Sequence, residues 1–254
     1  MRGGGEMASA AARLLVLSGF RVLVLERAEP LAVRRPVSFA QAVFDGEVVV
    51  EGVRGRRLPA GEAAPTADQV AVAVDPEALC LARVRPDVLV DARMLKGSGG
   101  TRRDQAPLVV GLGPGFVAGQ DVHAVVETQR GPDLGRVLWS GSAEPDSARP
   151  APVMGYADER VVRAPRAGRF TSSARIGDRV VGGDPLGRIE GEPVLAPIPG
   201  LLRGLVADGV RVEQGVKIGD IDPRGLSVAA ERISDKARAV AAGVLEAVLV
   251  AARR

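Results

Sequence analysis

The sequence predicts an α/β protein in three parts: a parallel-sheet domain over residues 1–150, a small all-β module over residues 158–224, and a helix over residues 227–254. Two observations carry this prediction. Short apolar runs alternate with helical segments in the first half, which is typical of a parallel sheet. In the second half a glycine-rich pattern that begins at Ala164 begins again at Ala196, which indicates two copies of one β unit.

The elements of the first half follow from periodicity and turn signals. A helix is predicted over residues 9–20, and a buried strand over residues 21–26 follows it. Turn signals around residues 45–52 predict an inserted β-meander. Further strands are predicted over residues 69–75, 87–92, 106–113 and 121–128, with a helix that begins at Pro76. We therefore expect a Rossmann-like sheet, on which the amphipathic C-terminal helix packs.

Composition limits the classes of partner. The 254 residues include 34 basic and 31 acidic side chains, and only 3% are aromatic. The arginines are scattered among acids, without a basic stripe or stacking platforms, so we expect no nucleic-acid partner. There is no signal peptide and no uncharged apolar run of about 18 residues, which predicts a cytoplasmic protein without a membrane partner. The single cysteine, Cys80, excludes a disulfide framework and a CxxC motif.

A glycine motif stands at the start of the chain. Gly3, Gly5 and Ala8 match G-x-G-x-x-A, and Glu26 ends the following strand. The interval of about 20 residues is that of a dinucleotide-binding loop, whose amides face a pyrophosphate while the acid binds ribose hydroxyls. Because a strand normally precedes such a loop, we expect the first two residues to end a longer strand encoded upstream. The alternative is that this turn packs a helix on the sheet and binds nothing.

Further cofactor-binding candidates come from a second glycine turn and a basic pair. Gly111, Gly113 and Gly115 follow a predicted strand, so their amides are expected at the sheet edge where ligands of parallel α/β folds bind. Arg34 and Arg35 are candidates for an anion clamp, although a solvated loop explains them equally well.

The catalytic candidates lie between residues 91 and 136, where ionisable side chains are dense. Lys96 can neutralise an anion, Asp104 can exchange protons, and His123 is the one histidine of the chain. The structural alternative for His123 is a hydrogen bond to a neighbouring strand. No spacing typical of a metal site or a nucleophile elbow is present, so the expected ligand is a nucleotide, such as NAD, or another phosphate-bearing molecule.

The repeat aligns residues 162–190 with residues 194–222 without gaps. Each copy reads as short strands joined by glycine turns, too small to bury a core alone. The pattern resembles biotinyl and lipoyl carrier domains, which have the barrel-sandwich hybrid fold. The modified lysine of such carriers stands on the hairpin between the two halves. Here that hairpin is IEGEPV (residues 189–194), which has no lysine, so we expect no covalent biotin or lipoate.

Several stretches together resemble a known family. They include RGGGEMASAAARLLVLSGFRVLVLE (residues 2–26), APLVVGLGPGF (106–116), DVHAVVETQRGPDLGRV (121–137) and GDIDPRG (219–225). These resemble the selenium-dependent molybdenum hydroxylase system proteins, the YqeB-like group. The resemblance implies a role in the maturation of selenium-containing molybdenum hydroxylases, with such a hydroxylase or its maturation factors as partner. The family has a histidine where Pro132 stands, so no role of that position is carried over.

Two classes of function stay open. The first is a non-catalytic accessory factor, monomeric or a homo-oligomer, that binds a nucleotide or a phosphate-bearing cofactor intermediate; the module without a carrier lysine favours it. The second is an NAD-dependent oxidoreductase or transferase that acts in molybdenum cofactor or selenium handling. The cluster of ionisable residues between 91 and 136 favours the second.

Overall fold

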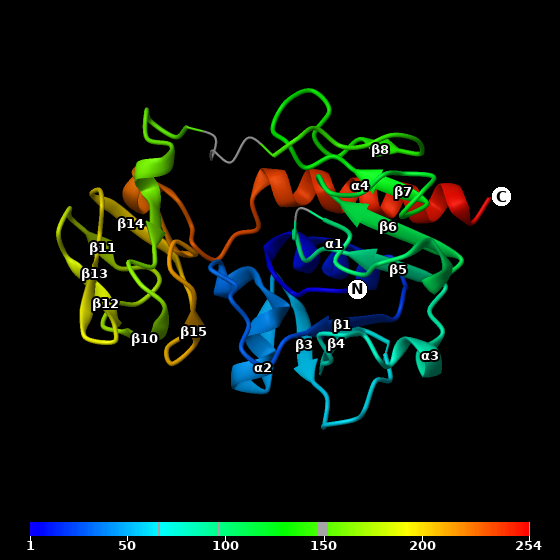
Figure 1. The fold of residues 1–254 in the computed structure, drawn as a ribbon, viewed down its shortest axis with the longest axis horizontal. Coiled ribbons are helices and arrows are strands. Elements are labelled where there is room, and N and C mark those ends of the chain that lie inside the picture. Colours follow the sequence, from blue (N-terminus) through cyan, green and yellow to red (C-terminus); the bar gives the residue numbers. More distant parts are fainter. Residues whose placement is uncertain (66, 96, 147–151, 254) are drawn as a thin grey trace. The chain divides into compact units, whose positions relative to one another are not determined.

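A computed structural model describes residues 1–65, 67–95, 97–146 and 152–253, which form two compact units (Figure 1). Unit 1 comprises Met1–Ala28, Val37–Asp146 and Ile233–Arg254, and unit 2 comprises Glu29–Pro36 and Ser147–Arg232. Each unit has an apolar core of its own. Both are therefore assembled from segments that are far apart in the sequence.

Unit 1 contains two four-stranded mixed sheets. The first has the order β1 (Val22–Glu26), β4 (Gln69–Val74), β3 (Val53–Arg57), β2 (Glu47–Val50). The second has the order β5 (Val88–Asp91), β6 (Leu108–Leu112), β7 (Ala124–Val126), β8 (Val137–Leu138). The outer strands β2 and β8 are antiparallel to their neighbours, and the other pairs are parallel. Arg2 connects the two sheets, because it forms parallel bridges with Leu25 and with Asp91.

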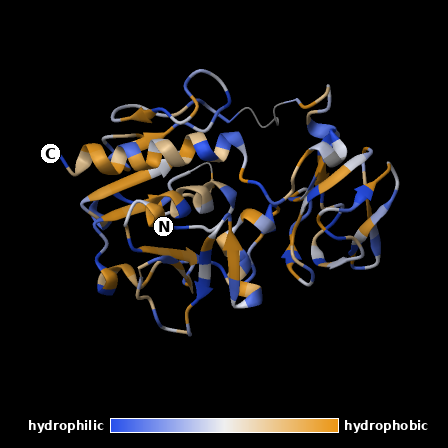
Figure 2. Cartoon of the chain, turned by 180° about the vertical axis from the view of Figure 1, so that it is seen from behind, coloured by the Kyte–Doolittle hydropathy of each residue, from blue (hydrophilic) through white to orange (hydrophobic). Residues whose placement is uncertain are grey.

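Two long helices pack on one face of these sheets. α1 (Glu6–Leu17) contacts β1 and β4, α4 (Asp235–Ala251) contacts β6, β7 and β8, and the two helices pack against each other. Ala8, Ala11 and Ala12 of α1 are completely buried, so the helix lies close to the strands. Figure 2 shows the strands beneath the helices as largely hydrophobic. This burial supplies most of the stability of the unit.

The opposite face of the sheets is covered differently. Side chains alternate along a strand, so Leu23 and Leu25 face away from the helices, as does Leu89 of the second sheet. They pack on loop residues and on the short helix α3 (Leu81–Val84). The remaining short helices are α2 (Ala42–Asp45) and the 3-10 turns η1 (Arg35–Val37), η2 (Phe39–Gln41), η3 (Arg103–Gln105), η4 (Asp158–Arg160) and η5 (Gly225–Ser227).

Unit 2 contains two four-stranded antiparallel sheets, with the orders β13-β12-β10-β15 and β11-β14-β16-β9. Their strands are β9 (Val161–Arg163), β10 (Gly168–Ser172), β11 (Arg179–Val180), β12 (Pro185–Ile189), β13 (Glu192–Leu195), β14 (Gly200–Leu205), β15 (Arg211–Val212) and β16 (Lys217–Asp222). The repeat is visible in their positions, because β10 begins at Gly168 and its counterpart β14 at Gly200. One apolar core, with Phe170 and Leu202 at its centre, is shared by strands of both copies.

The expected fold class is wrong. The sequence predicted a Rossmann-like parallel sheet beside a barrel-sandwich hybrid module, whereas the chain forms four small sheets, two mixed and two antiparallel. In the described part of unit 1, both long helices lie on the same face. The reason is local. The described residues of the glycine-rich connections from β5 to β6 and from β6 to β7 form no crossover helix, and the helix predicted at Pro76 shortens to α3.

Helix α4 approaches the loop before β8 without a side chain between them. A Cβ atom at Gly243 would overlap the Gly135 carbonyl oxygen and would lie 2.8 Å from Cγ1 of Val126. Gly135 has a φ of +85°, and a Cβ there would lie 2.5 Å from the Ala239 carbonyl oxygen. The two glycines therefore determine how closely α4 packs on the second sheet.

This contact yields a prediction for Gly243→Ala. Alanine favours a helix over glycine by about 1 kcal/mol, but the added methyl group has no room. We expect the free energy of unfolding to fall by about 1–3 kcal/mol in urea titrations, because the helix must move away from the sheet. Glu246→Ala, on the exposed side of α4, is the control and should change little. A Gly243→Ala variant as stable as the parent chain would contradict the close packing.

Candidate ligand-binding site

The candidate site lies where parallel strands of unit 1 end. The strand-like residues Met1–Arg2 lead into the glycine loop, β1 ends at Glu26, and β5 ends at Asp91. β6 leads into the second glycine turn. Since these strands run in the same direction, the segments that follow them meet at one edge of the sheets.

The first two glycines of the loop are required by packing. Gly3 has a φ of +91°, and a Cβ there would lie 3.3 Å from the backbone of Ala92. A Cβ at Gly4 would lie 2.9 Å from the Ala40 nitrogen and 3.0 Å from Cγ1 of Val24. The alternative reading of the motif, a device that packs the chain closely, therefore holds for these two positions.

Gly5 differs from its two neighbours. It has an ordinary extended conformation (φ −69°, ψ −177°), and among the described residues no atom lies within 4 Å of a Cβ placed there. Gly5 is also the N-cap of α1 and gives the helix no side-chain hydrogen bond. Neither backbone strain nor packing demands glycine at this position, so the space beside it is open to an approaching ligand.

The Glu26 carboxylate accepts hydrogen bonds at the glycine loop. Its Oε2 accepts a hydrogen bond from the Gly4 amide at 2.8 Å, and its Oε1 accepts one from the Arg27 amide at 2.8 Å. Burial raises the pKa of Glu26, and the two amide hydrogen bonds and the charge of Arg27 act against that increase. The carboxylate that was predicted to bind a ribose therefore also stabilises the glycine loop itself.

A buried ionic network fixes the turn after β5. Asp91 is 2% exposed and binds the Arg93 guanidinium at 2.6 Å and the Thr101 hydroxyl at 2.5 Å. Arg2, which is 4% exposed, donates to the same hydroxyl at 2.7 Å and to the Pro76 carbonyl oxygen at 3.3 Å. A carboxylate with this many partners serves as the centre of a structural network, which holds the 92–101 turn against the glycine loop.

The second glycine turn is also explained mainly by packing. A Cβ at Gly111 would lie 2.5 Å from the Phe116 ring. A Cβ at Gly113, whose φ is +72°, would lie 2.5 Å from Oγ1 of Thr128. The Gly113 amide already donates a hydrogen bond to the Val126 carbonyl oxygen. Gly115 has a φ of +101°, which favours glycine. The turn therefore brings Thr128 to the site, but its Gly113 amide does not face a ligand.

Glu127 organises the loops around this edge. It is 3% exposed, and its Oε1 accepts from the amides of Thr128 and Gln129, both at 2.6 Å. Its Oε2 accepts from the Glu144 amide at 2.7 Å. Three charge-assisted hydrogen bonds to backbone amides hold the segments around residues 128 and 144 together.

A small cavity of about 160 Å³ opens between these segments. Its lining comprises Met94, Pro114, Thr128, Gln129, Glu144, Asp146 and Lys236. It is smaller than the roughly 300–1,000 Å³ of pockets that enclose a whole ligand, so it suits one polar group of a larger molecule.

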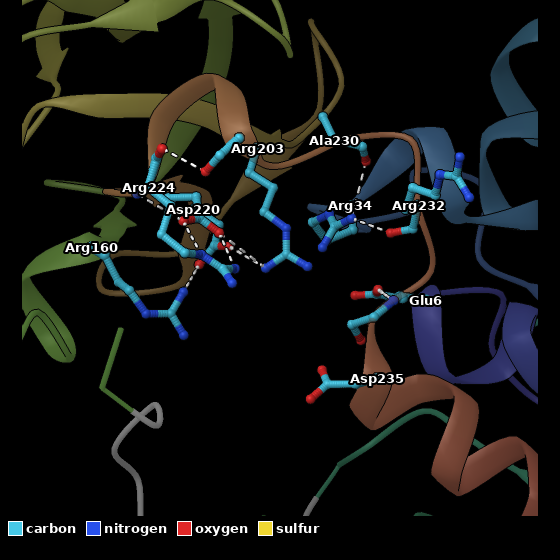
Figure 3. Close-up of polar contacts among 12 residues, drawn as sticks. Glu6, Arg34, Arg160, Arg203, Asp220, Arg224, Ala230, Arg232 and Asp235 are labelled. Atoms are coloured by element: carbon cyan, nitrogen blue, oxygen red, sulfur yellow. Dashed lines mark hydrogen bonds and ion pairs between the residues drawn. The ribbon is translucent and has the colours of Figure 1, made fainter. Parts of the chain in front are cut away.

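Lys236, in the first turn of α4, supplies the cation of this cavity. Burial lowers the pKa of its ammonium group, the nearby Arg130 lowers it further, and Glu127, Asp146 and Glu6 oppose both effects. Glu6, in the first turn of α1, accepts a hydrogen bond from the Ser234 amide at 2.9 Å (Figure 3). The beginnings of both long helices therefore meet near the cavity.

Two residues predicted from the sequence, Asp104 and His123, make other contacts in the structure. Asp104 forms an exposed ion pair with Arg102, in which the two side chains are 70% and 66% exposed. Lys96 lies outside the described residues. His123 begins the strand segment at the opposite end of β6, where its Nδ1 accepts a hydrogen bond from the Val109 amide at 3.0 Å. This contact supports the alternative that His123 has a structural role, as a hydrogen-bond partner of a neighbouring strand.

The predicted anion clamp is a structural feature of unit 2. Arg34 is 8% exposed and donates to the carbonyl oxygens of Ala230 and Arg232 at 3.0 and 2.9 Å (Figure 3). Arg35 donates from Nε to the Leu205 carbonyl oxygen at 2.7 Å. These hydrogen bonds tie the segment 29–36 to the rest of unit 2, so a structural role accounts for these contacts of both arginines, and their assignment as ligand-binding residues stays a prediction.

Sequence reasoning missed Lys236 and Thr128. The one available signal for Lys236 was the scarcity of lysine, since the chain has only three lysines against 31 arginines among its 34 basic residues. Periodicity placed the lysine on the C-terminal helix, but could not show which end of the sheet that helix reaches. Among the described residues, no group of three or more His, Cys, Asp or Glu side chains is arranged to hold a metal ion.

Comparison with known proteins gives one extensive similarity. No protein-family model matches the chain. Over 253 residues, the chain is 46% identical to the uncharacterized protein YqeB of Escherichia coli strain K12, and the match covers 98% of this chain. It covers 47% of that protein, so the chain spans about half the length of the relative it matches.

Solved structures show only partial similarity. An aspartoacylase family protein from Mesorhizobium loti is 15% identical and covers 25% of this chain and 23% of its own, with a TM-score of 0.24. A succinylglutamate desuccinylase/aspartoacylase from Rhodobacter sphaeroides is 24% identical and covers 25% of this chain and 21% of its own, with a TM-score of 0.23. Among the described helices, none is both long and apolar enough to cross a membrane.

The contact of His123 predicts a pH dependence of stability. Burial and the charge of Arg103 lower the pKa of His123 below its ordinary 6.5. Protonation of Nδ1 would also break the hydrogen bond that it accepts from the Val109 amide. The unfolded chain therefore takes up the proton first, and the free energy of unfolding should fall as the pH decreases below 6.5. Urea unfolding at about pH 7.5 and about pH 5.5 measures this loss.

His123→Asn is the matched control for this prediction, because asparagine keeps a hydrogen-bond acceptor but does not titrate. The variant should lose less stability between the two pH values than the parent chain. Because the chain has one histidine, an equal loss in both proteins would show that other groups cause it.

Proposed function

We propose that this chain is an accessory protein in the maturation of selenium-dependent molybdenum hydroxylases, and that it binds a nucleotide or another phosphate-bearing cofactor intermediate at the glycine loop of unit 1. The observation that carries the binding proposal is the open space beside Gly5, at the beginning of α1. The two preceding glycines are explained by packing, whereas Gly5 is not.

The two long helices of unit 1 differ at their beginnings in a way that supports this proposal. Ser234 caps α4, with its hydroxyl accepting a hydrogen bond from the Ala237 amide at 3.2 Å. Gly5 gives α1 no such bond. The first amides of a helix need partners and carry the positive end of its dipole, which favours an anion by about 0.3–2 kcal/mol. A phosphate group would accept hydrogen bonds from the first amides of α1, as the Ser234 hydroxyl accepts one from the Ala237 amide of α4.

Lys236 supports an anionic ligand as well. Its ammonium group lines the small cavity at the same edge, where partial burial strengthens its interaction with a phosphate. The cavity of about 160 Å³ has room for one such group, and the rest of the ligand would extend over the glycine loop.

The assignment to the molybdenum hydroxylase system has a separate basis. It comes from the motif resemblance found in the sequence and is supported by the 46% identity with YqeB, which is itself uncharacterized. A molybdenum hydroxylase or one of its maturation factors is therefore the proposed partner. Pull-down of the tagged chain from cells that express such a hydroxylase tests this part, and recovery of no pathway protein would count against it.

One observation favours the alternative, an NAD-dependent oxidoreductase or a transferase in the same pathway. A partly buried lysine with a lowered pKa is a group that can exchange protons during a reaction, and Lys236 has this property. Turnover of NADH, or transfer of a group from a bound nucleotide, that is lost in Lys236→Met would favour the enzyme.

The first test replaces Gly5 by leucine. The backbone of Gly5 suits any residue and its Cβ meets no described atom, so the variant should fold, and its unfolding temperature should fall only slightly because leucine is a poorer N-cap than glycine. The leucine side chain would occupy the ligand space, and titration calorimetry with NAD, NADP, ATP and CTP should show binding to the parent and none to the variant.

Gly182→Leu is the matched control. Gly182 lies in unit 2, is exposed, has no positive φ, and would place its Cβ 3.9 Å from the nearest atom. It should bind like the parent chain. If no nucleotide binds the parent at millimolar concentration, or if Gly5→Leu binds as well as the parent, the loop only packs the helix and the proposal fails.

Lys236→Met separates binding from stability. Removing a partly buried cation relieves its burial cost, so the unfolding temperature should stay the same or rise. The affinity for the nucleotide found in the first test should fall about tenfold, the loss of one charge-assisted hydrogen bond. An unchanged affinity would exclude Lys236 from the site.

A further inference from the structure

The cavity beside Lys236 is lined by groups of opposite charge that do not pair with each other. Lys236 and Glu144 both line it, and among the described residues neither the ammonium nor the carboxylate has a hydrogen-bond or ion-pair partner. Glu127, Asp146 and Glu6 act on Lys236 through their charges alone. The space between the Lys236 ammonium and the Glu144 carboxylate is therefore open to a ligand that contacts both.

The Thr128 hydroxyl is a second group of this cavity with unused binding capacity. Thr128 is 3% exposed and lines the cavity, and its amide donates to Glu127 Oε1 at 2.6 Å. Its hydroxyl, by contrast, has no hydrogen-bond partner in the part of the chain that the structure describes. Most buried hydroxyl groups have a partner. The unmet hydroxyl therefore indicates a ligand group that it can bind, such as a phosphate oxygen.

The walls of the cavity are held by one buried carboxylate. Glu127 Oε1 accepts from the Thr128 amide at 2.6 Å on one side, and its Oε2 accepts from the Glu144 amide at 2.7 Å on the other. Charge-assisted hydrogen bonds of this length are strong. The backbones that carry the free hydroxyl and the free carboxylate are therefore fixed relative to each other before a ligand arrives.

The helix that carries Lys236 is tied to the same walls. Arg130, two residues after Thr128, donates hydrogen bonds to both oxygens of Asp235, at 2.8 and 2.9 Å. Asp235 precedes Lys236 in the first turn of α4, which the Ser234 hydroxyl caps. The ammonium therefore extends from a fixed helix end into a cavity whose opposite side carries a carboxylate.

The acidic side chains of the lining, Glu144 and Asp146, oppose a bare phosphate group. A divalent cation on the phosphate removes this conflict, because a carboxylate binds the cation while the ammonium binds the phosphate oxygens. Mg²⁺ is commonly bound in this way, by one or two carboxylates together with substrate phosphates, and it keeps several of its waters. Such a site does not require three acidic ligands, and the described residues offer no group of that size.

We propose that the ligand of this site is the Mg²⁺ complex of a nucleoside diphosphate or triphosphate, with Glu144 as the protein ligand of the cation. Lys236 and the Thr128 hydroxyl bind the terminal phosphate, for which the cavity of about 160 Å³ has room. The other phosphates extend towards the first amides of α1. This inference rests on the proposed function, and it selects metal-bound nucleotides over NAD, which has no terminal phosphate.

The experiment is titration calorimetry of ATP and of CTP into the full chain, once with excess MgCl₂ and once with EDTA, at constant ionic strength. For the parent chain, Mg²⁺ should strengthen the binding of one of these nucleotides at least about tenfold, because the cation turns the repulsion between Glu144 and the phosphate into an attraction. NAD, titrated alongside, should gain little from Mg²⁺.

Glu144→Gln removes the ligand of the cation. Glu144 is exposed and its carboxylate has no partner among the described residues, so the variant should fold. With Mg²⁺ it should bind the nucleotide about tenfold more weakly than the parent chain does. With EDTA it should bind as well as the parent or better, because a repulsive charge is gone. Glu246→Gln is the matched control, since it removes the same charge from an exposed position of α4, and it should bind like the parent in both media.

Thr128→Val tests the hydroxyl. No hydrogen bond within the described chain is lost, so the unfolding temperature should stay the same or rise. The affinity should fall about tenfold in both media, the loss of one charge-assisted hydrogen bond to the phosphate. Reduced stability with unchanged affinity would assign Thr128 a structural role and overturn its place in the site.

The outcomes separate this inference from the proposed function. If neither nucleotide binds the parent chain in either medium, the proposed nucleotide site fails and the metal complex fails with it. If ATP or CTP binds the parent at least as tightly in EDTA as in Mg²⁺, the nucleotide site stands and the metal complex is overturned. The same conclusion follows if Mg²⁺ strengthens binding to Glu144→Gln as much as binding to the parent.

Discussion

The backbone pairing of residues 1–4 between β1 and β5 is the constraint on which the candidate site of unit 1 depends. Leu25 donates to the Met1 carbonyl oxygen, Gly3 donates to the Leu25 carbonyl oxygen, and Arg2 exchanges hydrogen bonds with the Val90–Ala92 segment, all at 2.8–2.9 Å. This short extended segment therefore joins two sheets that otherwise have no strand in common. It also sets where the glycine loop turns and where α1 begins.

Buried carboxylates then position the loops around that segment. Glu26 accepts a hydrogen bond from the Gly4 amide, Asp91 accepts hydrogen bonds from Arg93 and Thr101, and Glu127 accepts them from three amides. Each carboxylate loses its hydrogen bonds to water on burial, and charge-assisted hydrogen bonds from the protein replace them. Each carboxylate therefore makes its loop rigid. In unit 2, Asp220 accepts hydrogen bonds from Arg160 and Lys217, and Asp222 accepts them from Arg224.

Part of the fold could be predicted from the sequence because it depends on local chemistry. Apolar runs located β1, β4, β5 and β6 to within a few residues, since a buried strand must be apolar on both faces. The repeat was visible because its glycines recur at the same offset as the strands. The fold class was not predictable in this way. Local patterns could not show that the glycine-rich connections form no crossover helix over their described residues, or that both long helices lie on the same face.

The candidate site of unit 1 was likewise predictable from the sequence only in part. The sequence by itself determined that a glycine loop precedes a helix and that an acid ends the next strand, because these are features of neighbouring residues. Only the tertiary structure decided which glycine is open, since Gly3 and Gly4 are confined by residues 40 and 92 whereas Gly5 is not. It also turned Arg34 towards backbone carbonyls and brought Lys236 to a cavity whose other lining residues, 94 to 146, lie far earlier in the sequence. Burial and charge pairing depend on which distant segments meet, and residue type alone does not contain that information.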